Sequence, residues 1–305
     1  MVIRRAITGF LLSFVFLIFF VYMVSGVQMF SQALTANVSG FLQNTVIENS
    51  SGDNKIILPA VEAVEPEINA ESAISVESDL LGTSKIIFEK AGEKQLPIAS
   101  LTKLMTAVIV LDSYDVSKSI KVDKLADSQA PMKQDVKLDD TLPAESFLEL
   151  LLVKSSNKSA YALAQVTGIQ KFVGLMNQKA KSIGLKNTFF EDPAGLGPNN
   201  ISTAYDLAKF AEYILKNYPK IASISKAEEL DVPNFGKIIN TDQLLSEFPE
   251  IVCSKTGFTT EAKGCLLLVI NSQKNSNYTI NVILGADDRF LEMRKLINWS
   301  DEICK

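Results

Sequence analysis

The spacing of apolar and polar residues divides the chain beyond residue 70 into three parts. Segments near both ends show the alternation that is typical of strands, and they are 74–76, 86–88, 251–256, 265–270 and 279–284. Between them, apolar residues recur at the spacing of helices, over 147–153, 159–166, 172–183 and 204–215, and a last helix is expected over 290–297. Two shorter apolar segments, 120–122 and 136–138, predict another pair of strands. This order predicts an α/β (α+β) fold, with one antiparallel sheet built from the two ends of the domain and a helical region inserted between them.

A further apolar helix is predicted to begin just after Pro97, because proline cannot sit in a helix interior. Its core-facing residues follow the helical spacing, and they are Leu101, Leu104, Met105, Val108 and Ile109. Ser100 then falls in the first turn, and Lys103 lies one turn later on an adjoining face, where its amine can reach the Ser100 hydroxyl. Serine is also a common helix cap, so this pair alone favours a structural role.

The composition restricts the chemistry that this pair could perform. The chain of 305 residues contains no histidine, which excludes a Ser-His-Asp triad, a Cys-His dyad and a His-ligated zinc hydrolase. A base would have to come from Lys, Glu, Asp or Tyr. The net charge of −5, without a basic patch, argues against nucleic acid as a partner. We expect no metal and no cofactor.

The three cysteines have no metal-ligand spacing, and their number is odd. Cys253 and Cys265 lie on two segments predicted to be paired strands. A tight hairpin would not place them opposite each other, so we expect buried thiols rather than a disulfide.

The N-terminal segment predicts a membrane anchor. Arg4 and Arg5 precede residues 6–24, an uncharged and mostly apolar run that is longer than the core of a cleavable signal. The paired arginines should stay inside. We therefore expect residues 1–30 to form a single-pass anchor in the cell membrane, with the catalytic domain outside the cytoplasm; cleavage after Ala33 is the alternative. Residues 31–70 are polar and without a sustained period, which predicts a flexible tether, and residues 71–305 form the catalytic domain.

Three short segments carry candidate chemistry, and their order along the chain is informative. They are Ser100 with Lys103, Ser155 with Asn157, and Lys255, Thr256 and Gly257. With their flanks (97–106, 176–177, 192–196, 202–208 and 254–259) they resemble the active-site-serine penicillin-binding family, specifically the low-molecular-weight D-alanyl-D-alanine carboxypeptidases, whose elements are Ser-x-x-Lys, Ser-x-Asn and Lys-Thr-Gly. The resemblance runs from about residue 71 to residue 299 and implies a β-lactamase/DD-peptidase-like fold. Two departures are Ser156, where relatives often have Gly or Asp, and Phe258, where some have His.

The chemistry of these residue types predicts their roles. A serine hydroxyl is a poor nucleophile until a base removes its proton, and Lys103 can do so for Ser100 only while it is neutral. Burial and the cation of Lys255 should both lower the Lys103 pKa. Ser155 can relay a proton to the leaving amine. By resemblance, the backbone N–H groups of Ser100 and Phe258 form the oxyanion hole.

The remaining motif residues are predicted to bind the substrate. Asn157, two residues after Ser155 in a short extended turn, can hold a substrate amide, and Lys255 and Thr256 supply a charge and a hydroxyl for a substrate carboxylate. Gly257 lets a ligand backbone approach the strand. Taken one at a time, each motif could equally be an interhelix turn or a strand end.

The lysines beside Asn157, Lys154 and Lys158, are expected to be solvated and to add positive potential for an acidic peptide. Many relatives carry an extra C-terminal β-domain. Too few residues follow Lys255 for such a domain, so we expect it to be absent.

The resemblance implies a serine-type D-alanyl-D-alanine carboxypeptidase. It would act on peptidoglycan stem peptides ending in D-Ala-D-Ala through an acyl-enzyme on Ser100, with β-lactam antibiotics as covalent inhibitors. Three alternatives remain: a D,D-endopeptidase of crosslinks, a serine β-lactamase, and a non-catalytic β-lactam-sensing or wall-binding module. A β-lactamase would need a hydrolytic glutamate. Glu191 lies at the comparable point but in a carboxypeptidase-like segment, so we expect it to be a surface or structural carboxylate.

Overall fold

The computed structural model describes residues 64–272 and 277–303. The predicted anchor (1–30), most of the predicted tether (31–70) and Cys304 lie outside the described residues. Within the two described ranges, no helix is both long and apolar enough to cross a bilayer.

The globular domain begins a few residues before the predicted boundary at 71. Ile68 is only 2% exposed and belongs to the same hydrophobic cluster as Trp299 of α9 (Arg289–Ile303). The Asn69 N–H donates to the buried Glu292 carboxylate of that helix at 2.8 Å. The end of the predicted tether is therefore held by the last helix.

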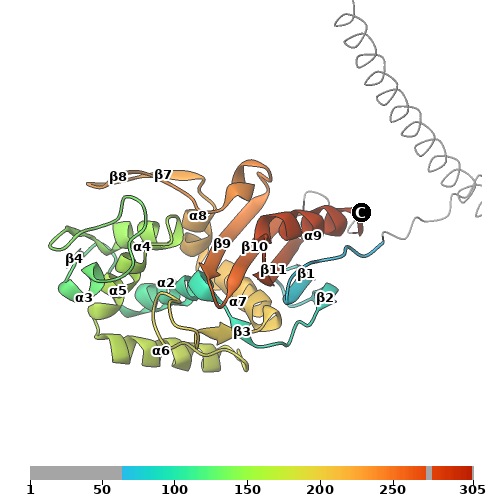
Figure 1. Cartoon of the computed structure of the whole chain (residues 1–305), viewed down its shortest axis with the longest axis horizontal. Coiled ribbons are helices and arrows are strands. Elements are labelled where there is room, and N and C mark those ends of the chain that lie inside the picture. The colour runs from blue at the N-terminus through green and yellow to red at the C-terminus, as the bar shows by residue number, and fades with distance from the viewer. Residues whose placement is uncertain (1–63, 273–276, 304–305) are drawn as a thin grey trace, which may run out of the picture. The chain divides into compact units, whose positions relative to one another are not determined.

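Five strands form one antiparallel sheet in the order β2-β1-β11-β10-β9 (Figure 1). Their bounds are β1 Ser72–Ser78, β2 Ser84–Lys90, β9 Ile251–Thr259, β10 Lys263–Asn271 and β11 Tyr278–Ala286. The first strand pairs with the last, with Ser72 opposite Leu284. The two ends of the domain thus meet in one sheet, as the spacing of apolar residues predicts.

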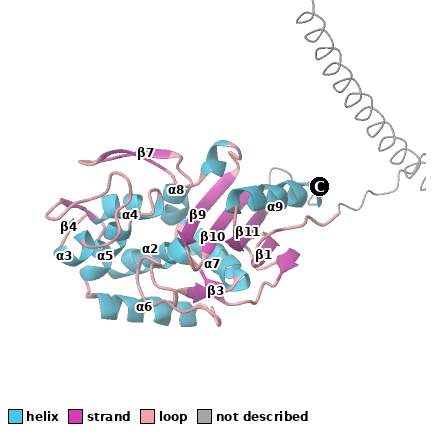
Figure 2. Ribbon diagram, viewed as in Figure 1, coloured by secondary structure: helices cyan, strands magenta, loops and turns pink. Residues whose placement is uncertain are grey.

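The helical region lies between β2 and β9 in the sequence and gathers on one side of the domain (Figure 2). Its helices are α2 Thr102–Ser113, α3 Lys124–Asp127, α4 Ala144–Leu152, α5 Asn157–Gln165, α6 Ile169–Ser182, α7 Ala204–Asn217 and α8 Pro219–Ser225. The predicted helices are confirmed. The sequence did not indicate α8 or the hairpin of β7 (Glu229–Val232) and β8 (Gly236–Ile239).

Both faces of the sheet are buried, because helices cover each of them. Along β10, Leu267 and Val269 join the cluster that includes the helical region, whereas Leu266 and Leu268 join the cluster under α9. Such alternation of side chains across a strand places a continuous apolar run between two layers. The segment Lys255–Gly257 on the neighbouring edge strand, β9, is thereby held on a rigid support.

The helix α2 runs through the interior of the helical region. All residues from Thr102 to Val110 are buried, so the predicted stripe is confirmed but the opposite side of the helix is buried as well. Polar groups on such a helix are costly unless they find partners within the protein. Thr106 donates to the Pro193 carbonyl at 2.6 Å, and the Lys103 amine contacts Asn157 Oδ1 and the Ala194 carbonyl. The buried Thr102 hydroxyl has no hydrogen-bond partner among the described residues.

The strand predicted at 136–138 is wrong. The partner of β4 (Ser119–Lys121) is β5 (Thr141–Pro143). The residues before β5 form a loop because aspartate carboxylates accept the backbone N–H groups that a strand would need for pairing: Asp135 accepts from Val136, and Asp140 accepts from Lys137. Val136 is buried as an anchor of this loop.

The prediction of buried thiols is confirmed for two cysteines. Cys253 lies opposite Val269 and Cys265 lies opposite Gly257 on the β9–β10 pair, and both are free and fully buried. Burial raises the pKa of each thiol to about 11, so neither is a ready nucleophile.

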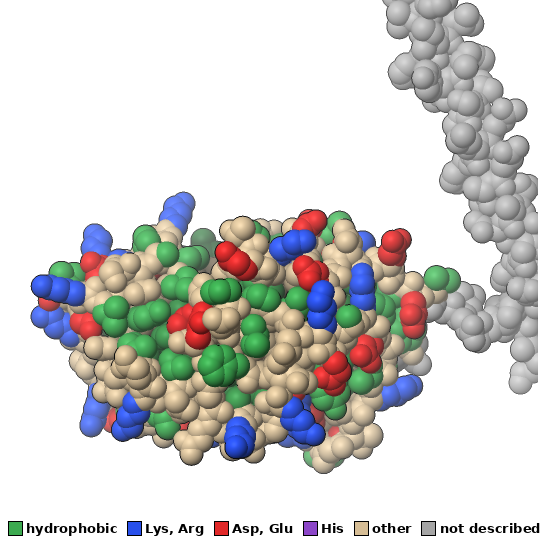
Figure 3. Space-filling model, turned by 60° about the horizontal axis from the view of Figure 1, so that its bottom comes forward, with side chains coloured by type: hydrophobic (Ala, Val, Ile, Leu, Met, Phe, Trp, Pro, Cys, Tyr) green, Lys and Arg blue, Asp and Glu red, His purple; other side chains and the backbone are tan. Residues whose placement is uncertain are grey.

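The surface carries charges of both signs. On the face shown in Figure 3, hydrophobic side chains gather in the middle, and lysine and arginine side chains lie mostly around the rim, with Asp and Glu among them. A mixed distribution of this kind does not form a single-sign field on that face.

Candidate active site

The three motifs converge on one pocket of about 170 Å³. Ser100 lies in the short 3-10 turn η1 (Ala99–Leu101) before α2, the second motif lies in the turn between α4 and α5, and the third lies on β9. The predicted site residues that line the pocket are Ser100, Ser155, Asn157, Thr256, Gly257 and Phe258. Lys103 and Lys255 lie behind this wall, at 0% and 1% exposure.

The amine of Lys103 has three neighbours, and they are not equivalent. Its Nζ lies 2.8 Å from Ser100 Oγ, 2.9 Å from Asn157 Oδ1 and 2.7 Å from the Ala194 carbonyl. The last two oxygens can only accept hydrogen bonds, whereas the serine hydroxyl can donate. A neutral amine therefore gives its two hydrogens to Asn157 and Ala194 and directs its lone pair at Ser100.

The environment of Lys103 favours that neutral form. Burial lowers its pKa to about 7, although the negative charges of Asp192 and Asp135 act in the opposite direction. The predicted lowering is found, and burial is its cause. Repulsion between the two lysines acts on Lys255, whose pKa is held well below its ordinary value by burial first and then by the charge of Lys103.

Two glycines, which have no side chain, allow other segments to pack closely against the backbone around Ser100. A Cβ at Gly195, where φ is +78°, would lie 1.9 Å from the Ala99 carbonyl, and one at Gly257 would lie 3.1 Å from the Ser100 nitrogen. Ala99 itself has a positive φ of 47°. The loop after Asp192 and the strand β9 therefore both touch the backbone that carries Ser100. Gly257 thus permits an approach of two protein segments, in addition to the predicted approach of a ligand.

A buried carboxylate organises the loop that holds Lys103, and sequence reasoning assigned it no role. Asp192 accepts hydrogen bonds from four backbone N–H groups and one side-chain amide, which belong to Ala194, Gly195, Leu196, Gly197 and Asn200. A carboxylate that satisfies several consecutive N–H groups fixes the direction of the intervening carbonyls. This is how the Ala194 carbonyl comes to face Lys103.

The turn between α4 and α5 differs from the predicted extended turn. Ser155 adopts the left-handed conformation with φ 62°, which costs a residue with a side chain roughly 1–2 kcal/mol. Its Oγ accepts from Lys255 Nζ at 3.0 Å, and the same amine donates to the Thr256 carbonyl at 3.0 Å. The second and third motifs are thus joined directly.

Asn157 already has protein partners on both sides of its amide. Its Oδ1 accepts from Lys103, and its Nδ2 donates to the Ala130 carbonyl at 3.0 Å. Asn157 therefore links Lys103 to the loop at 128–140. The predicted contact with a substrate amide stays a prediction, and it would use the second hydrogen of Asn157 Nδ2.

Six other residues line the pocket and were not predicted: Met132, Gly195, Leu196, Thr241, Thr259 and Arg289. The buried Nε of Arg289 has no hydrogen-bond partner among the described residues, and its guanidinium lies 4.6 Å from the Phe290 ring centre. Thr241 Oγ1 lies 2.6 Å from Thr256 Oγ1 and so orients that hydroxyl. No spacing in the sequence indicated Arg289 or Thr241.

Two charged residues near the motifs are structural. Lys158 was expected to be solvated but is buried, with its Nζ 2.6 Å from Asp127 Oδ1. Glu191 accepts from the backbone and the side-chain amide of Asn199, at 3.2 and 2.8 Å, in agreement with the prediction of a structural carboxylate. Within the described ranges, no three His, Cys, Asp or Glu residues are grouped so as to hold a metal ion.

Comparison with known proteins agrees with this geometry. The sequence profile of peptidase family S11, D-alanyl-D-alanine carboxypeptidase, matches residues 60–288. The chain belongs to this family. Family S11 thus accounts for the order of the three motifs and for the sheet that carries the third.

Similar members of family S11 include proteins with two different names. A D-alanyl-D-alanine endopeptidase of Escherichia coli is 35% identical over 79% of this chain and 80% of its own length. The D-alanyl-D-alanine carboxypeptidase DacF of Bacillus subtilis is 30% identical over 76% of this chain and 62% of its own length. The crystal structure of the carboxypeptidase DacD from Francisella tularensis superposes with a TM-score of 0.72 at 25% identity, covering 83% of this chain and 75% of that one.

The protonation state of Lys103 can be measured directly. We expect its side-chain NMR signal, in protein labelled with ¹³C at lysine Cε, to titrate with a midpoint of about 7, because burial disfavours the ammonium form. Lys103→Arg removes the signal and so assigns it. A Lys103 signal that titrates together with those of exposed lysines would contradict the lowered pKa.

Proposed function

We propose that this chain is a serine peptidase that cleaves D-alanyl-D-alanine bonds in peptidoglycan peptides through an acyl-enzyme on Ser100. The observation that carries the proposal is the arrangement around Lys103 Nζ, in which two obligate acceptors leave the serine hydroxyl as the one neighbour that can donate. Membership of family S11 supports the substrate class.

The reaction begins when neutral Lys103 takes the proton of Ser100. The Ser100 oxygen attacks the carbonyl carbon of the penultimate D-alanine, and the backbone N–H groups of Ser100 and Phe258 stabilise the oxyanion. The C–N bond then breaks, and the Ser155 hydroxyl relays to the leaving amine the proton that Lys103 took from Ser100, so that Lys103 is neutral again. Lys255 holds Ser155 Oγ in place for this step. Water hydrolyses the acyl ester and restores the serine.

In this proposal the terminal carboxylate of the substrate binds at the positively charged end of the pocket. Thr256 offers its hydroxyl, which Thr241 orients, and Arg289 offers a guanidinium whose Nε has no partner among the described residues. Lys255 is buried behind them, and its pKa is held well below its ordinary value, so Arg289 is the main positive charge at this end of the pocket. A cation in a partly buried pocket binds a carboxylate better than it would at the surface, because solvent screens it less.

Two alternatives are less well supported. A β-lactamase of the predicted kind would use a glutamate to position water, but Glu191 is engaged with Asn199. A binding-only module would not require a buried lysine with a pKa of about 7 beside a serine. Carboxypeptidase and crosslink endopeptidase both fit the proposed chemistry, since they differ only in the group attached to the leaving amine.

The first test is product release. The full chain should release D-alanine from a stem pentapeptide, cleave a D,D-crosslinked muropeptide, or do both, and a fluorescent penicillin should label Ser100. Ser100→Ala should abolish labelling and release, and Lys103→Ala should slow acylation at least about 100-fold because the proton acceptor is gone. The exposed Ser246→Ala serves as the matched control. Undiminished labelling of Ser100→Ala would place the nucleophile elsewhere.

The second test separates a target of β-lactams from an enzyme that destroys them. After exposure to benzylpenicillin and removal of the excess, intact-protein mass spectrometry should show the adduct persisting for many minutes, because Glu191, the acid at the comparable point, is engaged with Asn199. Glu191→Gln should leave the adduct lifetime unchanged. Rapid loss in the wild type, with trapping only in Glu191→Gln, would instead favour a β-lactamase.

The proposed location is the cell membrane, with the peptidase domain outside the cytoplasm. Its support is Arg4 and Arg5 before the apolar run at 6–24, since positive flanks remain on the cytoplasmic side. The protein should fractionate with membranes, and protease added to intact spheroplasts should digest the domain but not a cytoplasmic marker. Recovery of a soluble form beginning near Leu34 as the main species would contradict the anchor.

A further inference from the structure

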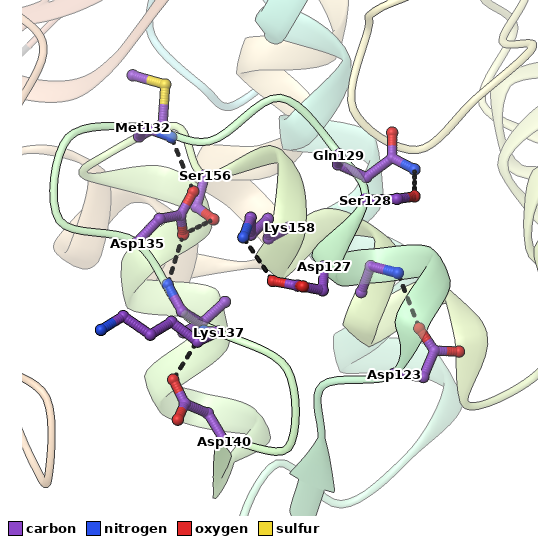
Figure 4. Close-up of polar contacts among 12 residues, drawn as sticks. Asp123, Asp127, Ser128, Gln129, Met132, Asp135, Lys137, Asp140, Ser156 and Lys158 are labelled. Carbon is purple, nitrogen blue, oxygen red and sulfur yellow. Dashed lines mark hydrogen bonds and ion pairs between the residues drawn. The ribbon is translucent and has the colours of Figure 1, made fainter.

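The loop at 128–140, between α3 and β5, is attached to the turn between α4 and α5 at two points, and one of them is the Asp135 carboxylate. Asp135 Oδ1 accepts from Ser156 Oγ at 2.7 Å and from the Val136 N–H at 2.9 Å, and its Oδ2 accepts from the Met132 N–H at 2.9 Å (Figure 4). The bond to Ser156 joins the loop to the turn between α4 and α5. The bonds to Val136 and Met132 lie within the loop and fix its backbone on either side of Asp135.

Ser156 is the residue on which the turn is built. Its Oγ both donates to Asp135 and caps α5 by accepting from the Ser159 N–H at 3.0 Å. On one side of it is Ser155, held in the left-handed conformation beside Lys255, and on the other is Asn157, bonded to Lys103. A displacement of Ser156 therefore moves both catalytic contacts.

The same loop contributes to the pocket. Met132 lines the pocket, and it lies between the two points at which the loop is attached to the turn: the Ala130 carbonyl, which accepts from Asn157, and Asp135, which accepts from Ser156. A methionine side chain is flexible, so its place in a wall depends on the backbone that carries it.

We propose that Asp135 is a positioning residue, which fastens the loop at 128–140 to Ser156 and so holds Met132 in the pocket wall and the Ser155–Asn157 turn against the two lysines. This inference rests on the proposed function and adds to it a determinant of substrate fit outside the three motifs. Asp135 is not among the residues that line the pocket.

Nearby aspartates provide the competing explanation and the control. Asp140 accepts from the Lys137 N–H at 2.8 Å and Asp123 accepts from the Ala126 N–H at 2.8 Å, so aspartates in this region also serve local structure alone (Figure 4). If Asp135 were merely another such residue, replacing it would resemble replacing Asp140 in every measurement.

The charge of Asp135 should affect the pH dependence of acylation, which a purely structural role would leave unchanged. Three charged groups interact electrostatically with Lys103. They are Asp192 in the loop after α6, Asp135 in the loop at 128–140, and Lys255 on β9. Asp135 raises the Lys103 pKa, so removing its charge lowers that pKa and leaves the base neutral at lower pH. The acid limb of the acylation rate should then move to lower pH.

The experiment compares five variants of the full chain: Asp135→Ala, Asp135→Asn, Ser156→Ala, Met132→Ala and Asp140→Ala. Asp135→Ala should lower the rate of acylation by a fluorescent penicillin on the order of tenfold to a hundredfold and raise KM for a pentapeptide, because the reacting groups are misplaced. Asp140→Ala should stay within about twofold of wild type. Met132→Ala should reproduce the KM effect without a shift of the pH profile.

The pH profile and a double-mutant cycle decide the outcome. The acid limb should move to lower pH in both Asp135 variants and stay in place in Ser156→Ala and Asp140→Ala. Asp135→Ala with Ser156→Ala should cost less than the sum of the single changes, which separates their bond from the cap that Ser156 also forms. Asp135→Asn, which keeps the shape of the side chain, carries the pH test if the alanine variant does not fold.

Additive losses, an unmoved acid limb, or equal effects of Asp135→Ala and Asp140→Ala would overturn the positioning role. Failure of the wild-type chain to be labelled or to release product would instead overturn the proposed function. The two failures are therefore distinguishable.

Discussion

The burial of one lysine amine is the constraint on which the site depends. Removing an ammonium from water is unfavourable, so the folded protein either surrounds it with acceptors or keeps it neutral. Around Lys103 the protein does part of each. Two acceptors bind the amine, and two carboxylates favour its charged form from a distance. Burial disfavours the charged form more strongly than these carboxylates favour it. The result is a pKa of about 7, which lets a lysine act as a base without help from histidine, a residue that the chain lacks.

Three otherwise separate parts of the fold are organised to meet this requirement. The loop fixed by Asp192 supplies one carbonyl, the turn capped by Ser156 supplies Asn157, and β9 closes against the backbone of Ser100 because Gly257 has no side chain. Each part uses buried hydrogen bonds whose donors would be costly to leave unsatisfied. Rigidity at the site therefore comes from satisfied polar groups within loops, with the sheet and α2 as the frame.

Much of this fold could be predicted from the sequence, because long segments with a clear period indicate their own structure. The helices around 147–215 and the three closing strands are examples. The motif residues were also predicted, because their order along the chain resembles that of the active-site-serine penicillin-binding family, although each motif alone is weak evidence. The convergence of Ser100, Ser155 and Thr256 on one pocket agrees with that prediction, while their chemical roles stay predictions.

The features that escaped prediction have a common physical origin. Asp135 and Asp192 act on backbone N–H groups of irregular loops, and such loops have no periodic signal. The left-handed conformation of Ser155 is normally marked by glycine, and here a serine adopts it. Arg289 and Thr241 reach the pocket from distant parts of the chain, a proximity that only the three-dimensional pairing of strands creates. The strand predicted at 136–138 failed for a related reason, since carboxylates competed for its backbone donors.

The pairing of β1 with β11 has a consequence for how the site comes into being. Ser75 and Asn281, joined by a side-chain hydrogen bond across this pair, are 206 residues apart, so the sheet closes only after nearly the whole chain has been synthesised. Contacts of such long range form late in folding. The third motif lies on β9 of the same sheet, so its final placement beside Ser100 and Ser155 belongs to this late stage of folding.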